Sequence, residues 1–117
     1  MATGTTAGVN FLGTTDSQPL ELKVGGLRGL RLEPTGSSYP NVIGGGPSDL
    51  ASNGVTGVFV GGGAYNTAEF FSAVAGGDLN KASGLYSVVG GRFINTASGD
   101  YSFVGGGSDT SDVSNTL

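Results

Sequence analysis

The feature that most constrains this chain is an internal repeat of about fifteen residues. The run LYSVVGGR (residues 85–92) returns fifteen positions later as DYSFVGGG (residues 100–107). Four columns keep this interval through a third, earlier copy: Phe71, Tyr86 and Tyr101; Ser72, Ser87 and Ser102; Val74, Val89 and Val104; and Gly76, Gly91 and Gly106. A helical-pair repeat needs roughly 34 residues, so the shorter period suits one coil of a small β-solenoid. The repeat therefore predicts an all-β fold of stacked short strands.

Changes in repeat length fall in the turns and leave the strand register intact. Asn66, Asn80 and Asn95 stand before the three regular copies at intervals of 14 and 15 residues. Two irregular copies come earlier, NVIGGG (Asn41–Gly46) and VFVGGG (Val58–Gly63). Gly and Asn tolerate the positive φ that tight corners need. We therefore expect five coils, the last three at 14–15 residues each, with negligible helix over residues 58–107.

Side chains alternate across a strand, so the repeat sorts into two faces. One face carries the valine and serine columns. The other carries the aromatic column together with three further residues: Ala73, Val88 and Phe103. Both faces are largely apolar, which is typical of strands buried on both sides. One face can fill the interior of the coil, and we expect further copies of the chain to cover the other.

Composition supports assembly and disfavours several functions. With 24 glycines in 117 residues and 37% hydrophobic residues, a monomer would bury little apolar area against its chain entropy. A net charge of −4 with five basic residues disfavours a nucleic-acid partner. The chain has no His and no Cys, which excludes a histidine base, a thiol nucleophile and disulfides. Neither a signal peptide nor an apolar run of about 18 residues is recognisable, so no membrane insertion is expected.

The sequence predicts no catalytic, cofactor or metal site. The triple glycines at 44–46, 61–63 and 105–107 lack the Lys-Ser/Thr continuation of a phosphate loop. Calcium-binding β-rolls repeat every nine residues with a fixed Asp, a pattern that is absent here. A β-helix enzyme that cleaves polysaccharides would need two facing carboxylates. The nine acidic residues form no strand column: Asp16, Glu21, Glu33, Asp49, Glu69, Asp78, Asp100, Asp109 and Asp112.

A glycan-binding module stays open as the alternative function. The aromatic column could act as a sugar-stacking ladder, and Tyr65, just before an Asn turn, is a more exposed candidate. Packing between copies of the chain is the other use of the same rings.

Four segments are expected along the chain. Residues 1–18 form a Thr/Gly-rich arm. Residues 19–34 read as a β-hairpin, because leucine and valine alternate with charged residues on both sides of Gly25-Gly26. Residues 35–107 form the solenoid, and residues 108–117 form a polar C-terminal tail.

The stretch ASGLYSVVGG (Ala82–Gly91) and its copy Ala97–Gly106 fit an A-x-G-x-x-S-x-A-x-G pattern, with valine at the second alanine. This pattern resembles the YadA-like head repeats of trimeric autotransporter adhesins and is similar to repeats of trimeric phage-type tail-fibre proteins. The resemblance implies a left-handed parallel β-roll, with three chains around a common axis. It also implies a non-enzymatic attachment role on an extracellular surface or a phage-like particle. The implied partners are a receptor, a glycan or a baseplate-like assembly.

Overall fold

The computed structural model describes residues 8–9 and 11–112, and all regular structure within them is β. Twelve strands form two sheets. The strands of sheet A are β1 (Leu20–Val24), β2 (Leu27–Glu33), β3 (Asn41–Gly44), β5 (Phe59–Val60), β7 (Ala73–Val74), β9 (Val88–Val89) and β11 (Phe103–Val104). The strands of sheet B are β4 (Leu50–Ala51), β6 (Thr67–Ala68), β8 (Lys81–Ala82), β10 (Thr96–Ala97) and β12 (Ser111–Asp112).

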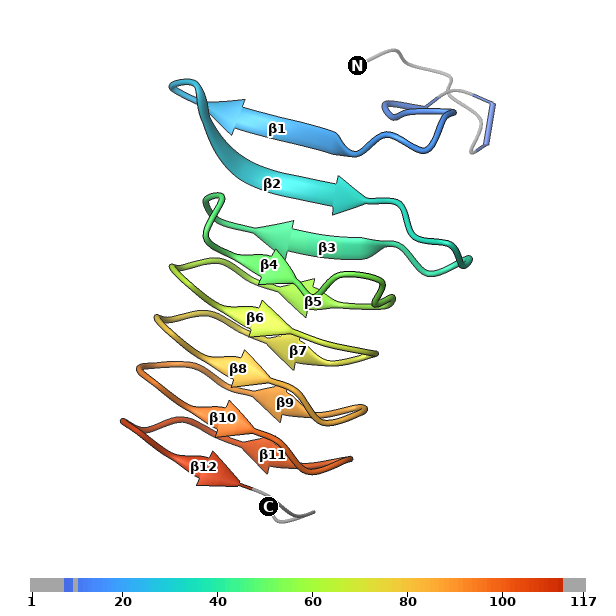
Figure 1. The fold of residues 1–117 in the computed structure, drawn as a ribbon. Helices are drawn as coiled ribbons and strands as arrows, with labels where there is room; N and C mark the ends of the chain where they lie inside the picture. Colours follow the sequence, from blue (N-terminus) through green and yellow to red (C-terminus); the bar gives the residue numbers. More distant parts are fainter. Residues whose placement is uncertain (1–7, 10, 113–117) are drawn as a thin grey trace.

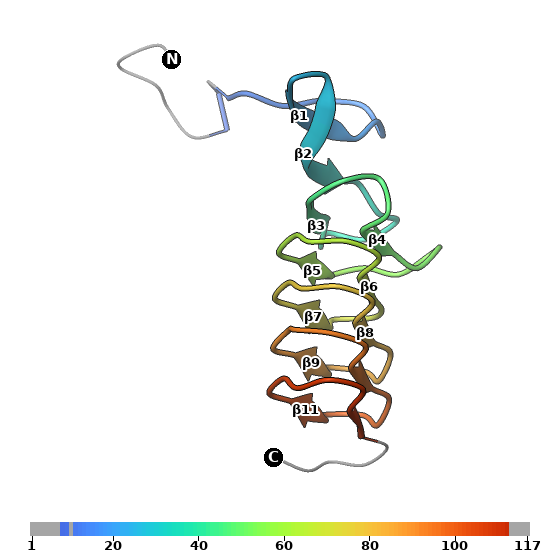
Figure 2. The ribbon, with the colours of Figure 1, turned by 90° about the vertical axis from the view of Figure 1, so that its left-hand side faces the viewer.

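From β3 to β12 the chain alternates between the two sheets and forms a β-solenoid (Figure 1). Sheet A lines one side of the stack and sheet B the other (Figure 2). Parallel pairing aligns Val60 with Val74, then with Val89 and Val104. This arrangement confirms the predicted stack of short strands. The stacking continues past residue 107, where a polar tail was expected, because Ser111 and Asp112 pair with Thr96 and Ala97.

The antiparallel strands β1 and β2 extend sheet A beyond the first coil. They connect at Gly25 and Gly26, which have φ values of 58° and 81°. Strand β2 then pairs antiparallel with β3, and β3 pairs parallel with β5. One continuous seven-stranded sheet therefore joins the front segment to the solenoid.

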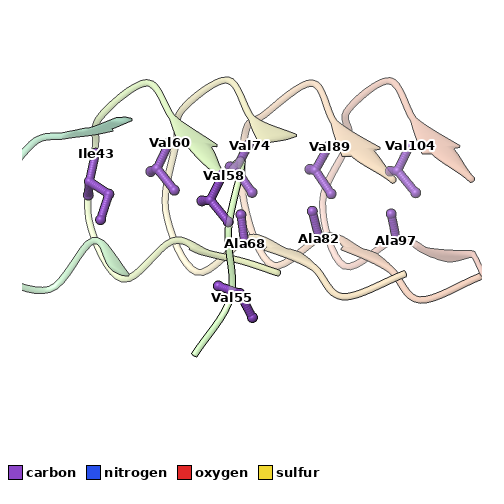
Figure 3. Close-up of a cluster of buried hydrophobic side chains, with 10 residues drawn as sticks. All are labelled: Ile43, Val55, Val58, Val60, Ala68, Val74, Ala82, Val89, Ala97 and Val104. Atoms are coloured by element: carbon purple, nitrogen blue, oxygen red, sulfur yellow. The ribbon is translucent and has the colours of Figure 1, made fainter. Parts of the chain in front are cut away.

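The core of the solenoid consists of two facing rows of small apolar side chains. Valines from sheet A point across the coil toward alanines of sheet B (Figure 3). The serine column is buried beside the valines, and Ser72 Oγ donates to the carbonyl oxygens of Glu69 and Ala82 at 2.7 and 3.0 Å. The predicted sorting of valine and serine onto one face is confirmed, and this face is the inner one.

A buried column of asparagines links the coils. Asn80 Oδ1 accepts hydrogen bonds from the backbone N and Nδ2 of Asn95 at 2.9 and 3.1 Å. Asn66 Oδ1 accepts the same pair of bonds from Asn80 at 3.1 and 3.2 Å. Each amide nitrogen also donates to turn carbonyls, as Asn80 Nδ2 does to Gly76 and Arg92 at 3.0 Å each. Buried polar groups need such hydrogen-bond partners. The asparagine ladder supplies them to buried polar groups at one corner of every regular coil.

The ladder begins with an aspartate and an arginine in place of one asparagine. Asp49 Oδ1 accepts from the backbone N and Nδ2 of Asn66 at 3.1 and 2.9 Å. Asn66 Nδ2 donates to the carbonyl oxygen four residues earlier, on Gly62, at 3.0 Å. Asp49 has no amide to donate, and Arg28 Nε from β2 donates to the equivalent carbonyl of Gly45 at 3.2 Å. The front segment thus completes the first coil.

We expect the solenoid to tolerate a deletion in a turn but not in a strand. Deleting Ser83 gives the spacing between Ala82 and Ser87 that the 14-residue coil has between Ala68 and Ser72. Deleting Val88 sends every later side chain to the opposite face. Far-ultraviolet circular dichroism and thermal melting should show a β spectrum with a cooperative transition only for the Ser83 deletion. Equal behaviour of the two variants would contradict the register argument.

Substitutions inside the asparagine ladder and at its first position, Asp49, should differ in their effect on stability. Asn80→Ala leaves the carbonyl of Gly76 without a donor and the backbone N of Asn95 without an acceptor, while the Arg92 carbonyl keeps the backbone N of Asp78 as a donor. At about 1–3 kcal/mol per unsatisfied buried group, the unfolding free energy should fall by at least about 2 kcal/mol. Asp49→Asn keeps the Oδ1 acceptor, so its change should stay below about 1 kcal/mol. Urea unfolding measures both, and similar losses would argue against the ladder.

Candidate functional site

The described residues contain no cluster of three or more acidic side chains that could hold a metal ion. A cavity of about 610 Å³ lies between the segment that follows β2 and the loop that joins β4 to β5. Its hydroxyl groups already bond to one another: Thr35 Oγ1 lies 3.0 Å from both Ser37 Oγ and Thr56 Oγ1. These bonds hold the two loops together. The candidate functional site is instead an apolar surface on sheet A.

The outer face of sheet A carries a continuous file of apolar side chains. Strand register places seven residues side by side on this face: Leu20, Leu32, Val42, Phe59, Ala73, Val88 and Phe103. Their sequence neighbours Ile43, Val60 and Val74 point into the coil, so the file points away from it. Phe59 is 47% exposed and Phe103 is 42% exposed. The file crosses all seven strands of sheet A and has no cover in the described chain.

The opposite face of β1 and β2 is charged. Arg31 Nη1 lies 2.9 Å from Glu21 Oε1, and Arg31 Nε lies 3.0 Å from Glu33 Oε2. The hydrogen bond from Arg31 lowers the pKa of the Glu21 carboxyl below its ordinary value, with a smaller contribution from Lys23. Beyond the solenoid, only one face of sheet A is therefore apolar.

The aromatic column forms a stacked ladder at the start of the sheet A strands. The ring centroids of Phe71 and Tyr86 lie 5.3 Å apart, and those of Tyr86 and Tyr101 lie 5.4 Å apart, with interplanar angles of 14° and 15°. Tyr39 meets Phe71 edge-on at 5.7 Å. Because stacked rings cover one another's faces, they leave mainly their edges free. A sugar stacks on a ring face, so this geometry favours packing with other side chains over glycan binding.

Exposed apolar residues adopt left-handed backbone conformations on both sides of the sheet A strands. We call Phe71, Tyr86 and Tyr101, which precede β7, β9 and β11, the aromatic edge; their φ values are 51°, 57° and 59°. We call Tyr65, Leu79 and Ile94 the mixed edge; they lie in the turns after β5, β7 and β9, two positions before the sheet B strands β6, β8 and β10, and their φ values are 54°, 58° and 51°. Such conformations cost bulky side chains about 1–3 kcal/mol each, whereas Gly and Asn adopt them readily.

Sequence reasoning found the aromatic edge but missed the mixed edge. The aromatic column repeats one residue type at one interval, so it stands out. The mixed edge combines a tyrosine, a leucine and an isoleucine at intervals of 14 and 15 residues. A usable signal existed, because each member directly precedes an asparagine of the ladder. Tyr65, proposed as an exposed aromatic, is 63% exposed and belongs to this second edge.

The ion pairs of β1 and β2 predict a loss of stability in acid. A carboxyl whose folded pKa is lowered stabilises the fold above its unfolded pKa, and this contribution is lost as pH falls through the folded value. Hydrogen exchange of β1 and β2 amides should therefore accelerate relative to the solenoid below about pH 4, after correction for the intrinsic exchange rate. Glu21→Gln should weaken this pH dependence. An unchanged profile in that variant would contradict a role for the Arg31 contact.

Helices long and apolar enough to cross a membrane are absent from residues 8–9 and 11–112. The site described above is a surface of repeated apolar columns with no cluster of reactive groups. Comparison with models of protein families, with curated proteins and with solved structures finds no match for this chain.

Proposed function

We propose that this chain is a non-enzymatic structural segment of a homotrimeric fibre that serves in attachment. The observation that carries the proposal is the uncovered apolar file on the outer face of sheet A, which crosses seven strands. Exposed apolar patches of this extent mark interaction surfaces in soluble proteins. The partner that fits best is a second copy of the chain, because its file has the same strand spacing and chemistry.

The distribution of aromatic residues supports burial between copies. All six phenylalanines and all four tyrosines lie on the surface of the single chain, and each is at least 36% exposed. Within residues 8–9 and 11–112, the largest buried apolar side chain is that of Ile43. Large apolar side chains contribute most to stability when they are buried. A single chain leaves this contribution unused, and assembly around an axis parallel to the stack would recover it.

The number three and the biological setting come from the resemblance to YadA-like heads and phage-type tail fibres. Cyclic symmetry allows three identical faces to close around one axis. In that arrangement the chain acts as a rigid, left-handed spacer or head that presents a receptor-binding or baseplate-binding surface. An extracellular surface or a phage-like particle is the setting that suits it. The stacked ring geometry makes a glycan-binding module the less favoured alternative.

The mass in solution tests the proposal. Light scattering should give 3 × 11.5 = 34.5 kDa for the trimer. Val88→Asp would bring three like charges together in a dry interface, at a cost of several kcal/mol for each unpaired charge, and should abolish the trimer. The matched control is Thr96→Asp on sheet B, beside Lys81, which should keep the trimer mass. A folded wild-type monomer of 11.5 kDa at micromolar concentration would refute the proposed function.

A further inference from the structure

The folding of a single chain does not explain why both edges of the solenoid hold exposed apolar residues at positive φ. Six exposed apolar residues, three on each edge, adopt positive φ. Asn or Gly would adopt this conformation with less strain. Ile94 is the sharpest case, because a β-branched residue at a φ of 51° is a clear outlier. The chain therefore tolerates strain to hold large apolar side chains at the surface.

The two edges lie on opposite sides of the apolar file. The aromatic edge lies in the turns that lead into the strands of sheet A, and the mixed edge lies in the turns that lead from sheet A to sheet B. These two lines of turns stand at opposite ends of the sheet A strands (Figure 1). Both edges repeat once per coil and therefore share the spacing of the stack. Strands β7 and β9 have an apolar residue at both edges, namely Phe71 with Leu79 and Tyr86 with Ile94.

We propose that the aromatic edge of one copy packs against the mixed edge of the next copy. This inference rests on the proposed trimer and specifies its contacts. A closed ring of identical chains uses two different patches on each chain, and one patch meets the other at every interface. Rotation about an axis parallel to the stack keeps each coil at its own height. The residues that flank β9 therefore meet between copies, Tyr86 of one chain with Ile94 of the next.

The arrangement explains why the two edges differ in character. Flat tyrosine and phenylalanine rings present a regular ridge of ring edges, and the aliphatic side chains of Leu79 and Ile94 from the neighbouring chain pack against those edges. The outer file of sheet A lies between the edges and faces the axis, so all three surfaces form one continuous interface. The burial of Tyr65, Leu79 and Ile94 by a neighbour offsets the strain that their backbone carries.

A charge-swap cycle tests the contact in the full chain. Tyr86→Lys alone and Ile94→Glu alone should each place charges in an apolar interface and raise the dissociation constant of the trimer at least about tenfold. The double variant Tyr86→Lys/Ile94→Glu carries opposite charges that meet at every interface, so most of the loss should be recovered. Thr96→Glu on sheet B serves as the control and should leave assembly unchanged. Light scattering over a dilution series gives the masses, and circular dichroism reports folding of each variant.

Each outcome bears on one proposal. Recovery of the trimer in the double variant supports contact between the edges, even if the single variants fail to fold. Single variants that assemble as the wild type does, or a double variant no better than the worse single one, would overturn the edge contact and leave the trimer intact. A monomeric wild-type chain would instead overturn the proposed function.

Discussion

The fold depends on the hydrogen-bonded column of Asp49, Asn66, Asn80 and Asn95. Asp49 Oδ1, Asn66 Oδ1 and Asn80 Oδ1 each accept two hydrogen bonds from the next asparagine. Asn95 Oδ1 accepts one from the backbone N of Thr110. Each asparagine amide also donates to carbonyls of the glycine-rich turns. Neighbouring coils also pair through backbone hydrogen bonds, such as Ala73 N to the carbonyl of Ser87 at 3.0 Å and Asp78 N to the carbonyl of Arg92 at 2.8 Å. Together with these bonds, the asparagine column fixes the register of each coil relative to the previous one. The columns of surface residues therefore keep the same register from coil to coil.

Several glycines of the solenoid are required by the close approach of neighbouring coils. A Cβ on Gly63 would lie 2.0 Å from the carbonyl oxygen of Gly77 and 2.9 Å from Asn66 Nδ2. A Cβ on Gly77 would meet Asn80 Nδ2 and the backbone of Arg92 in the same way. Only glycine allows the turn carbonyls to reach the amides of the ladder. The glycines at these positions, the geometry of the turns and the buried asparagine column therefore depend on one another.

Features that follow from repeated residue types could be predicted from the sequence, and features that occur once could not. The columns at fifteen residues predicted stacked strands, with Val89 and Val88 on opposite faces, because alternation along a strand is a local rule. The exchange of one asparagine for Asp49 with Arg28 depends on a side chain 21 residues away, so no local pattern indicates it. The mixed edge was missed because its members share a backbone conformation, not a residue type. The extension of the stack to Ser111 and Asp112 was missed because a polar strand resembles a tail.

The narrow interior also determines where the large apolar side chains of the regular coils lie. The space between the sheets admits valine opposite alanine, so the chain cannot bury a phenylalanine or a tyrosine inside a regular coil. Every large apolar side chain in those coils must go outside, where water or another copy meets it. Because the asparagine column repeats each position once per coil, one outward residue becomes a file along the stack. A fold with so small a core thereby concentrates its largest apolar groups on the surface where a partner can bury them.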